Sequence, residues 1–148
     1  MMGEPVGGQD RLFYEFDLED LVPPGHLLLK IDAVLDLSWL RSELKSHYSD
    51  TGRPLICPEL MIRMLLAGYC YSIHSVRRLC QDVKLNTAYH WFCGLGLEDK
   101  FPHHSTFSVN RHSRFRESDI LRKVFEEVVC GCMKVRLFLH SKVTRHHR

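Results

Sequence analysis

The sequence predicts an all-α protein, built as a bundle of short helices. Apolar residues recur every three or four positions in several segments between residues 26 and 133, which is the period of helices that bury one face. Ser, Pro and Gly residues, which favour helix starts and ends, separate these segments. No segment alternates apolar and polar residues over the length of a β-strand. An extended amino-terminal arm and a frayed, basic carboxyl-terminal tail complete the expected fold.

The composition places the chain among globular proteins and locates its positive charge. A chain of 148 residues, 45% hydrophobic and 26% charged, can form one domain with one core. Residues 1–100 contain 10 Lys and Arg against 14 Asp and Glu, whereas residues 101–148 contain 10 against 4. The last third is therefore basic, which favours a polyanionic partner such as a nucleic acid.

The cysteines and the absence of a targeting pattern predict a cytoplasmic protein with free thiols and no membrane partner. No signal-peptide pattern begins the chain, and no apolar run reaches about 18 residues. Cys130 and Cys132 with a later histidine, or Cys93 with His103 and His104, do not have the spacing of a zinc site. We therefore expect no metal site, no cofactor and no nucleophilic catalytic centre in this chain.

Three regions divide the chain. Residues 1–11 contain three glycines and are expected to form a flexible leader. Residues 12–133 are expected to form the helical domain, in which an acidic arm at 12–22 lies extended over the core. Residues 134–148 contain no acidic residue and no stable periodicity, so they are expected to form a basic, disordered tail.

The first two helices are expected to form a hairpin. One helix follows His26, with apolar residues such as Leu28 and Ile31 on its inner face. Ser38 is the expected N-cap of the second helix, whose inner face includes Leu44. Turn-forming residues from 49 to 54 then end this pair.

Three further helices follow in close succession. Pro58 begins an apolar helix expected to be central to the core. Ser75 is the expected cap of the next helix, on which Arg77 and Arg78 face outward. A short helix from about residue 87 to 93 stops at Gly94.

A helix over residues 105–116 has the sequence features most typical of a binding element. Pro102 closes the preceding segment, and His104 or Ser105 begins the helix. Phe107, Arg111 and Phe115 are expected on the inward stripe, where Arg111 forms an ion pair or stacks on an aromatic ring. The polar outer face and its flanks are expected to comprise Thr106, Val109, Asn110, His112, Ser113, Arg114 and Arg116.

A last helix starts at Ser118-Asp119 and carries an apolar stripe that includes Ile120, Val124 and Val128. The series of short helices that ends with 105–116 is typical of a helix-turn-helix DNA reader. The helix at 75–85 is a rival to the one at 105–116 for the groove, because it carries Arg77 and Arg78.

Four motifs in order resemble the amino-terminal domain of bacterial insertion-sequence transposases of the InsH type, from about Phe13 to Met133. They are Pro58-Glu-Leu-Met-Ile-Arg-Met-Leu-Leu, Ser75-Val-Arg-Arg-Leu-Cys, Trp91-Phe-Cys-Gly-Leu-Gly-Leu97 and Pro102-His-His-Ser-Thr-Phe-Ser108. The resemblance implies a helical domain that recognises transposon ends, followed by an RNase H-like domain whose DDE carboxylates hold Mg²⁺. Since the sequence ends near the expected first aspartate, we expect a truncated copy with no catalytic residue.

One position departs from the resemblance. His103 occupies the place where the family usually has an aspartate. If that aspartate pairs with an arginine such as Arg111, its replacement costs about 1–3 kcal/mol, and His103→Asp should raise the melting temperature.

Two classes of function follow from these patterns. The first is binding to double-stranded DNA at transposon ends, with the contacts expected from Thr106, Asn110, Ser113, Arg114, Arg116, Arg77 and Arg78. The second is a protein interaction module whose apolar helix faces join two copies or bind a full-length transposase, which such a fragment could inhibit. Salt separates them, because phosphate contacts weaken with salt and apolar contacts do not.

Overall fold

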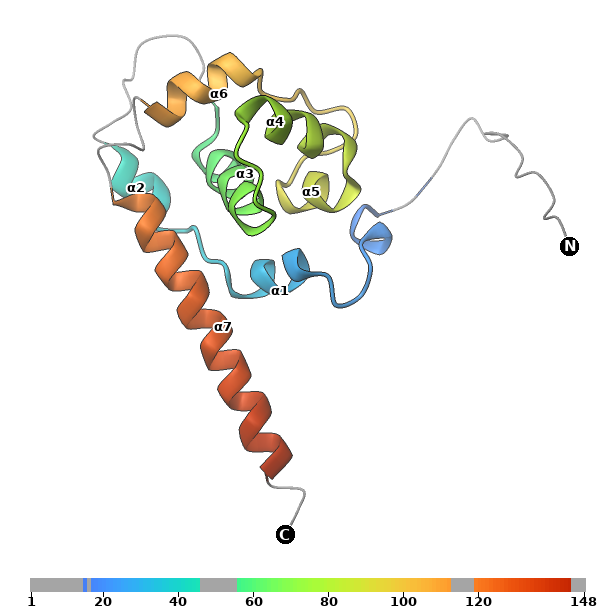
Figure 1. Cartoon of the computed structure of the whole chain (residues 1–148), viewed down its shortest axis with the longest axis vertical. Coiled ribbons are helices and arrows are strands. Elements are labelled where there is room, and N and C mark those ends of the chain that lie inside the picture. The colour runs from blue at the N-terminus through green and yellow to red at the C-terminus, as the bar shows by residue number, and fades with distance from the viewer. Residues whose placement is uncertain (1–14, 16, 46–55, 113–118, 145–148) are drawn as a thin grey trace, which may run out of the picture.

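Every regular element in the described part of the chain is helical, which confirms the all-α prediction (Figure 1). The computed structural model describes residues 15, 17–45, 56–112 and 119–144. The elements are η1 (Glu19–Leu21), α1 (Leu27–Val34), α2 (Leu40–Leu44), α3 (Pro58–Cys70), α4 (Val76–Leu85), α5 (Thr87–Phe92), α6 (His104–Asn110) and α7 (Ile120–Thr144).

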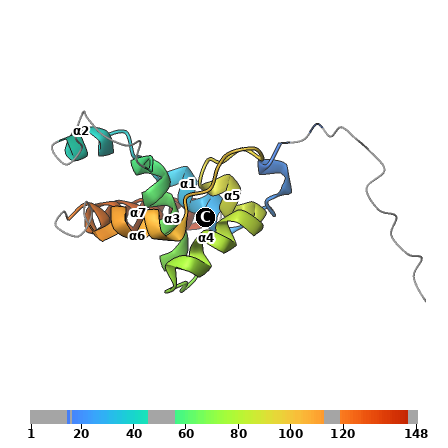
Figure 2. The same cartoon turned by 90° about the horizontal axis from the view of Figure 1, so that it is seen from above.

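Helix α3 is central to the core, as expected from its broad apolar face. Met61, Ile62 and Met64 have no exposed surface, and α2, α4 and α5 all pack against this helix (Figures 1 and 2). Pro58 occupies its first turn, where a missing backbone donor is tolerated. The α3 backbone lies close to α4, since a Cβ atom added to Gly68 would lie 3.2 Å from Cδ2 of Leu79.

Local capping residues explain how α4 and α5 follow each other with only one residue between them. The Ser75 hydroxyl accepts a hydrogen bond from the Arg78 backbone N–H at 3.3 Å, which confirms the predicted cap of α4. Asn86 ends α4 and caps α5, because its Oδ1 accepts from the N–H groups of Ala88 and Tyr89 at 3.0 and 3.3 Å. Gly94, with φ of 70°, follows α5 in the conformation that glycine tolerates best.

The predicted hairpin of the first two helices is wrong. Helix α1 packs mainly on α5 and α7, and an extended connection carries the chain away from α1 to α2 (Figure 1). Ser38 does not cap α2, because the helix begins at Leu40 and its N-cap residue is Trp39, with no side-chain cap hydrogen bond. Residues 46–55, which include the predicted turn, lie outside the described residues.

Polar contacts attach α2 to α7. The indole Nε1 of Trp39 donates to Oε2 of Glu127 at 3.1 Å. The ammonium group of Lys123 lies 4.3 Å from the centre of the Trp39 ring and pairs with the carboxylate of Glu43. These contacts link residues 80 to 88 positions apart in the sequence.

Arg63 of α3, which is partly buried, joins three helices. Its Nη1 donates to Oδ1 of Asp32 in α1 at 2.6 Å and to the carbonyl oxygen of Phe92 in α5 at 2.9 Å. Its guanidinium carbon also lies 5.1 Å from the centre of the Phe92 ring. Arg63 therefore has the ion-pairing and aromatic-stacking role that the sequence analysis assigned to Arg111.

Two boundaries differ from the sequence prediction. The expected extended arm contains the short 3-10 turn η1, which packs against α5. Helix α7 does not fray after Cys132, because it continues to Thr144 and extends away from the other helices (Figure 1). Residues 134–144 contain no Gly or Pro and include the good helix formers Lys, Arg and Leu, so the helix persists without an amphipathic pattern.

Candidate nucleic-acid interface

Helices α4 and α6 pack against each other and bring together two of the predicted binding segments (Figure 1). The contact buries Phe107 completely, which confirms its predicted inward position. Thr106 and Ser105 are exposed on α6, while Arg77 and Arg78 are exposed on α4. The packing therefore brings together two segments about 30 positions apart in the sequence.

The expected outward position of Asn110 is wrong. Its side chain is only 2% exposed, because Asn110 follows Phe107 by three residues and thus lies on the same side of the helix. Its Nδ2 donates to the Thr106 carbonyl oxygen at 2.7 Å, and its Oδ1 has no hydrogen-bond partner among the described residues. Asn110 is therefore a buried polar residue in this arrangement and cannot reach a base edge.

The expected inward position of Arg111 is also wrong. Helix α6 ends at Asn110, and Arg111 is its exposed C-cap, beyond the α-helical turns that bury Phe107. The other predicted residues of this region, Ser113, Arg114, Phe115 and Arg116, lie outside the described residues.

The start of α6 is fixed by His103, a role that the sequence analysis did not predict. Its Nδ1 accepts a hydrogen bond from the backbone N–H of Ser105 at 3.4 Å and lies 2.7 Å from the Ser105 hydroxyl. Pro102 precedes this cap, and Phe101 before it packs edge-on against the His90 ring at 4.9 Å between ring centres. Ring contacts at Phe101 and capping at His103 therefore position the first turn of α6.

A cluster of three basic side chains, Arg77, His103 and His104, forms where α4 meets the start of α6. The rings of His103 and His104 have centres 4.2 Å apart. Partial burial lowers the pKa of His104, and the nearby positive charges of His103 and Arg77 lower it further. The basic cluster thus disfavours an additional proton on His104 in the unbound chain.

The two arginines of α4 differ in their partners. Arg78 Nε lies 3.5 Å from Oδ2 of Asp82 one turn later on the same helix, where the arginine side chain is 73% exposed and the carboxylate side chain 32%. Within the described ranges, Arg77 has no carboxylate at ion-pair distance. Arg77 therefore offers a positive charge that no described carboxylate offsets.

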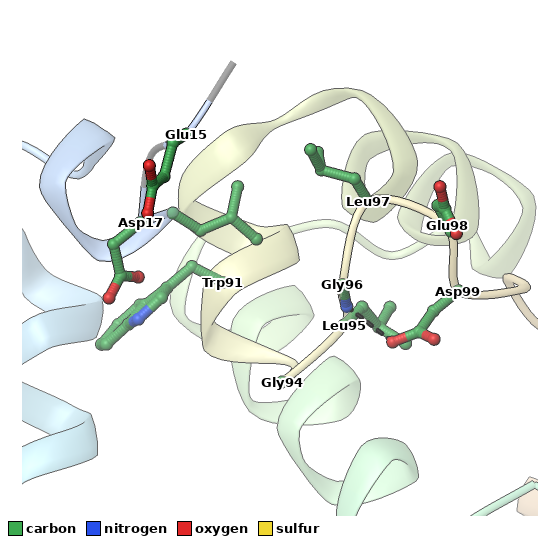
Figure 3. A pocket seen from close by; sticks show the side chains of 10 residues that line it. Glu15, Asp17, Trp91, Gly94, Leu95, Gly96, Leu97, Glu98 and Asp99 are labelled. Atoms are coloured by element: carbon green, nitrogen blue, oxygen red, sulfur yellow. Dashed lines mark hydrogen bonds between the residues drawn. The ribbon is translucent and has the colours of Figure 1, made fainter. Parts of the chain in front are cut away.

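A hollow on the surface is lined by acidic side chains, in contrast to the basic cluster of α4 and α6 (Figure 3). It has a volume of about 950 Å³ and lies between the segment before η1 and the turn after α5. Its lining includes the carboxylates of Glu15, Asp17, Glu98 and Asp99, with Trp91 at its side. Because carboxylates repel phosphate groups, this hollow does not fit a nucleic acid.

None of the helices in the described ranges combines the length and apolar character needed to cross a membrane. No curated protein and no solved structure matches the chain. A family model does match it, over residues 16–113, a segment that extends from just before η1 to just past α6 and covers most of the chain. On this match the chain belongs to the family described as Transposase domain (DUF772).

Proposed function

We propose that this chain binds double-stranded DNA at transposon ends, through the surface formed by α4 and α6. The observation that supports the proposal most directly is the packing of α4 against α6, which places Arg77, His103 and His104 together without a described carboxylate partner. Membership of a transposase family makes DNA the expected polyanion. Such a surface suits the phosphate backbone, which dominates affinity in protein–DNA complexes.

Different side chains on this surface take different parts in the proposal. Arg77 and Arg78 are exposed cations that contact phosphates and set the register of the duplex. Thr106 is an exposed hydroxyl on α6 that donates to a phosphate or a base edge. Ser113, Arg114 and Arg116 extend this set in sequence, whereas the buried Asn110 does not belong to it.

Fluorescence anisotropy with the full chain tests the proposal. The probes are a duplex from the ends of the element that encodes the chain and a scrambled duplex of equal length. Arg77→Gln should weaken binding to both duplexes and reduce the slope of log affinity against log salt by about one, because one phosphate contact is lost. Lys30→Gln removes an exposed charge from α1, on the other side of α3 from α6, and serves as the matched control (Figure 1).

Two results would contradict the proposal. One is the absence of binding to either duplex at low salt. The other is an equal loss of affinity in Arg77→Gln and Lys30→Gln, which would indicate attraction by the net charge rather than by the surface of α4 and α6.

A second function, self-association, is favoured by an apolar stripe on α7. Phe125, Val129 and Met133 follow one another at four-residue spacing and are 37%, 41% and 60% exposed. Tyr69 extends the stripe, since its ring lies edge-on to that of Phe125 at 4.8 Å and is 69% exposed. The partner we propose for this stripe is the same stripe of a second copy, or of a full-length transposase with the same helix.

Sedimentation across a salt series separates the two functions. Association through an apolar stripe should persist or strengthen as salt rises, while DNA binding should weaken steeply. Val129→Glu should abolish association and leave the salt slope of DNA binding unchanged. A protein that stays monomeric at every concentration and salt level would rule out the second function alone.

A further inference from the structure

Three groups that can carry positive charge converge from two elements at the junction of α4 and α6. His103 and His104 have ring centres 4.2 Å apart, and the charge of Arg77 acts on His104 from α4. The described neighbours on α6 contribute only the hydroxyls of Ser105 and Thr106. Among described residues, no Asp or Glu lies at ion-pair distance from any of the three basic groups.

Repulsion among the basic groups of this cluster disfavours a proton on His104 in the unbound chain. The pKa of His104 lies below its ordinary value of 6.5, because of partial burial, His103 and Arg77 in that order. His103 directs Nδ1 to Ser105 as the cap of α6, so this nitrogen already has a partner. The negative charge of a bound anion opposes the effect of these basic neighbours and therefore favours a proton on His104.

We propose that Arg77, His103 and His104 form a binding site for one phosphodiester group of the DNA backbone, and that His104 takes up a proton from solvent when this group binds. The proposal rests on the proposed DNA-binding function and adds the identity of the contacted group and the coupling to protons. A phosphodiester fits because it carries a full negative charge and presents several acceptor oxygens, whereas a base edge carries no net charge. A guanidinium and an imidazolium supply the matching donors.

Proton uptake by His104 predicts the direction in which DNA affinity changes with pH. The bound phosphate favours protonated His104 and so raises the pKa of this side chain above its value in the unbound chain. Affinity should then increase as the pH falls between the raised and the lowered pKa values, by up to about ten-fold per pH unit for one proton. Above the raised pKa His104 is neutral both with and without DNA, so its protonation should no longer make the affinity depend on pH.

The experiment measures the affinity of the full chain for a short duplex at constant ionic strength, over a range of about pH 5 to 8 that brackets histidine titration. His104→Gln should bind more weakly at the acidic end and lose most of the pH dependence. His74→Gln, which removes an exposed histidine before α4, should keep the wild-type profile. NMR titration of the His104 ring should show a higher pKa with duplex than without it.

The possible outcomes distinguish this inference from the proposed function. Three results would overturn the phosphate site while leaving DNA binding intact. They are a DNA affinity that does not depend on pH, a pH dependence that His104→Gln leaves unchanged, and a pH dependence that is lost in His74→Gln instead. Absence of duplex binding at every pH would reject both. An unchanged His104 pKa in the presence of bound duplex would overturn the proton coupling directly.

Discussion

Asn110 illustrates how a single residue can be misplaced when a helix is described by one stripe. The wheel that places Phe107 inward also places Asn110 only 60° away, because three residues turn the helix by about 300°. Its polarity suggested an outward position, but proximity to Phe107 determined its burial. The same wheel correctly predicted Phe107 as buried and Thr106 as exposed, since neither residue has competing preferences.

The burial of Asn110 predicts that an apolar residue is tolerated there. Its Oδ1 is buried without a hydrogen bond from any described residue, and such a group costs about 1–3 kcal/mol. Asn110→Leu keeps the branched shape of the side chain without its polar atoms and should therefore raise the free energy of unfolding by about 1 kcal/mol, as measured by urea denaturation. DNA affinity should not change, whereas Thr106→Ala should reduce it. A loss of DNA binding in Asn110→Leu at undiminished stability would instead make Asn110 a reader of the DNA.

His103→Asp should stabilise the chain for a reason different from the one the sequence suggested. His103 and Arg111 are the N-cap and C-cap at opposite ends of α6, so an aspartate at 103 faces His104 and Arg77 instead. Asp is among the best N-cap residues, and a carboxylate at this end also complements the helix dipole, together contributing about 1 kcal/mol. The melting temperature should rise, more at pH 6 than at pH 8, because the carboxylate favours protonated His104. The control His103→Asn supplies a cap without charge and should show the rise without its pH dependence.

At the scale of helices, sequence reasoning succeeded where the signal is local. Ser75 and Pro58 begin their helices as predicted, because a cap or a first-turn proline acts within three or four residues. Ser38 has the same chemistry, but α2 starts one residue later than this cap would require, with Trp39 at the N-cap. The carboxyl end of α7 lacked a periodic pattern, yet helix-forming residues without Gly or Pro were sufficient to continue it.

The crossing of α1 and α7 depends on a glycine whose role only the tertiary structure reveals. A Cβ atom added to Gly131 would lie 2.8 Å from Cβ of Val34, which is closer than such atoms approach. Gly131→Ala should therefore lower the free energy of unfolding by about 1–3 kcal/mol, although alanine by itself favours a helix. Urea denaturation of the double variant Gly131→Ala/Val34→Ala should recover most of the loss. Equal stability of wild type and Gly131→Ala would mean that the two helices do not pack this closely in solution.

At the scale of the whole molecule, the candidate interface could not be located from the distribution of charge along the chain. The basic last third suggested where a polyanion binds, but Arg77 belongs to the acidic first 100 residues and reaches α6 only through the packing of α4. The acidic hollow beside Trp91 similarly combines residues before η1 with the turn after α5 (Figure 3). Such pairings depend on tertiary contacts, which periodicity and capping do not specify.

The first half of α7 packs against the other helices and its second half projects from them, which predicts that the second half contributes little to stability. Ile120, Val124 and Val128 of α7 are buried against the bundle, while Met133 and Val135 are exposed and the helix continues away from it (Figure 1). Because packing, rather than helix propensity, supplies most of the stability of a helix, removal of residues 137–148 should leave the melting temperature within about 2 °C of wild type. Circular dichroism should show a loss of helical signal, and hydrogen exchange in the intact chain should be faster after residue 136 than before residue 128. A large fall in melting temperature on truncation would instead show that this end of α7 has a packing partner, for which the stripe of a second copy is the first candidate to examine by sedimentation.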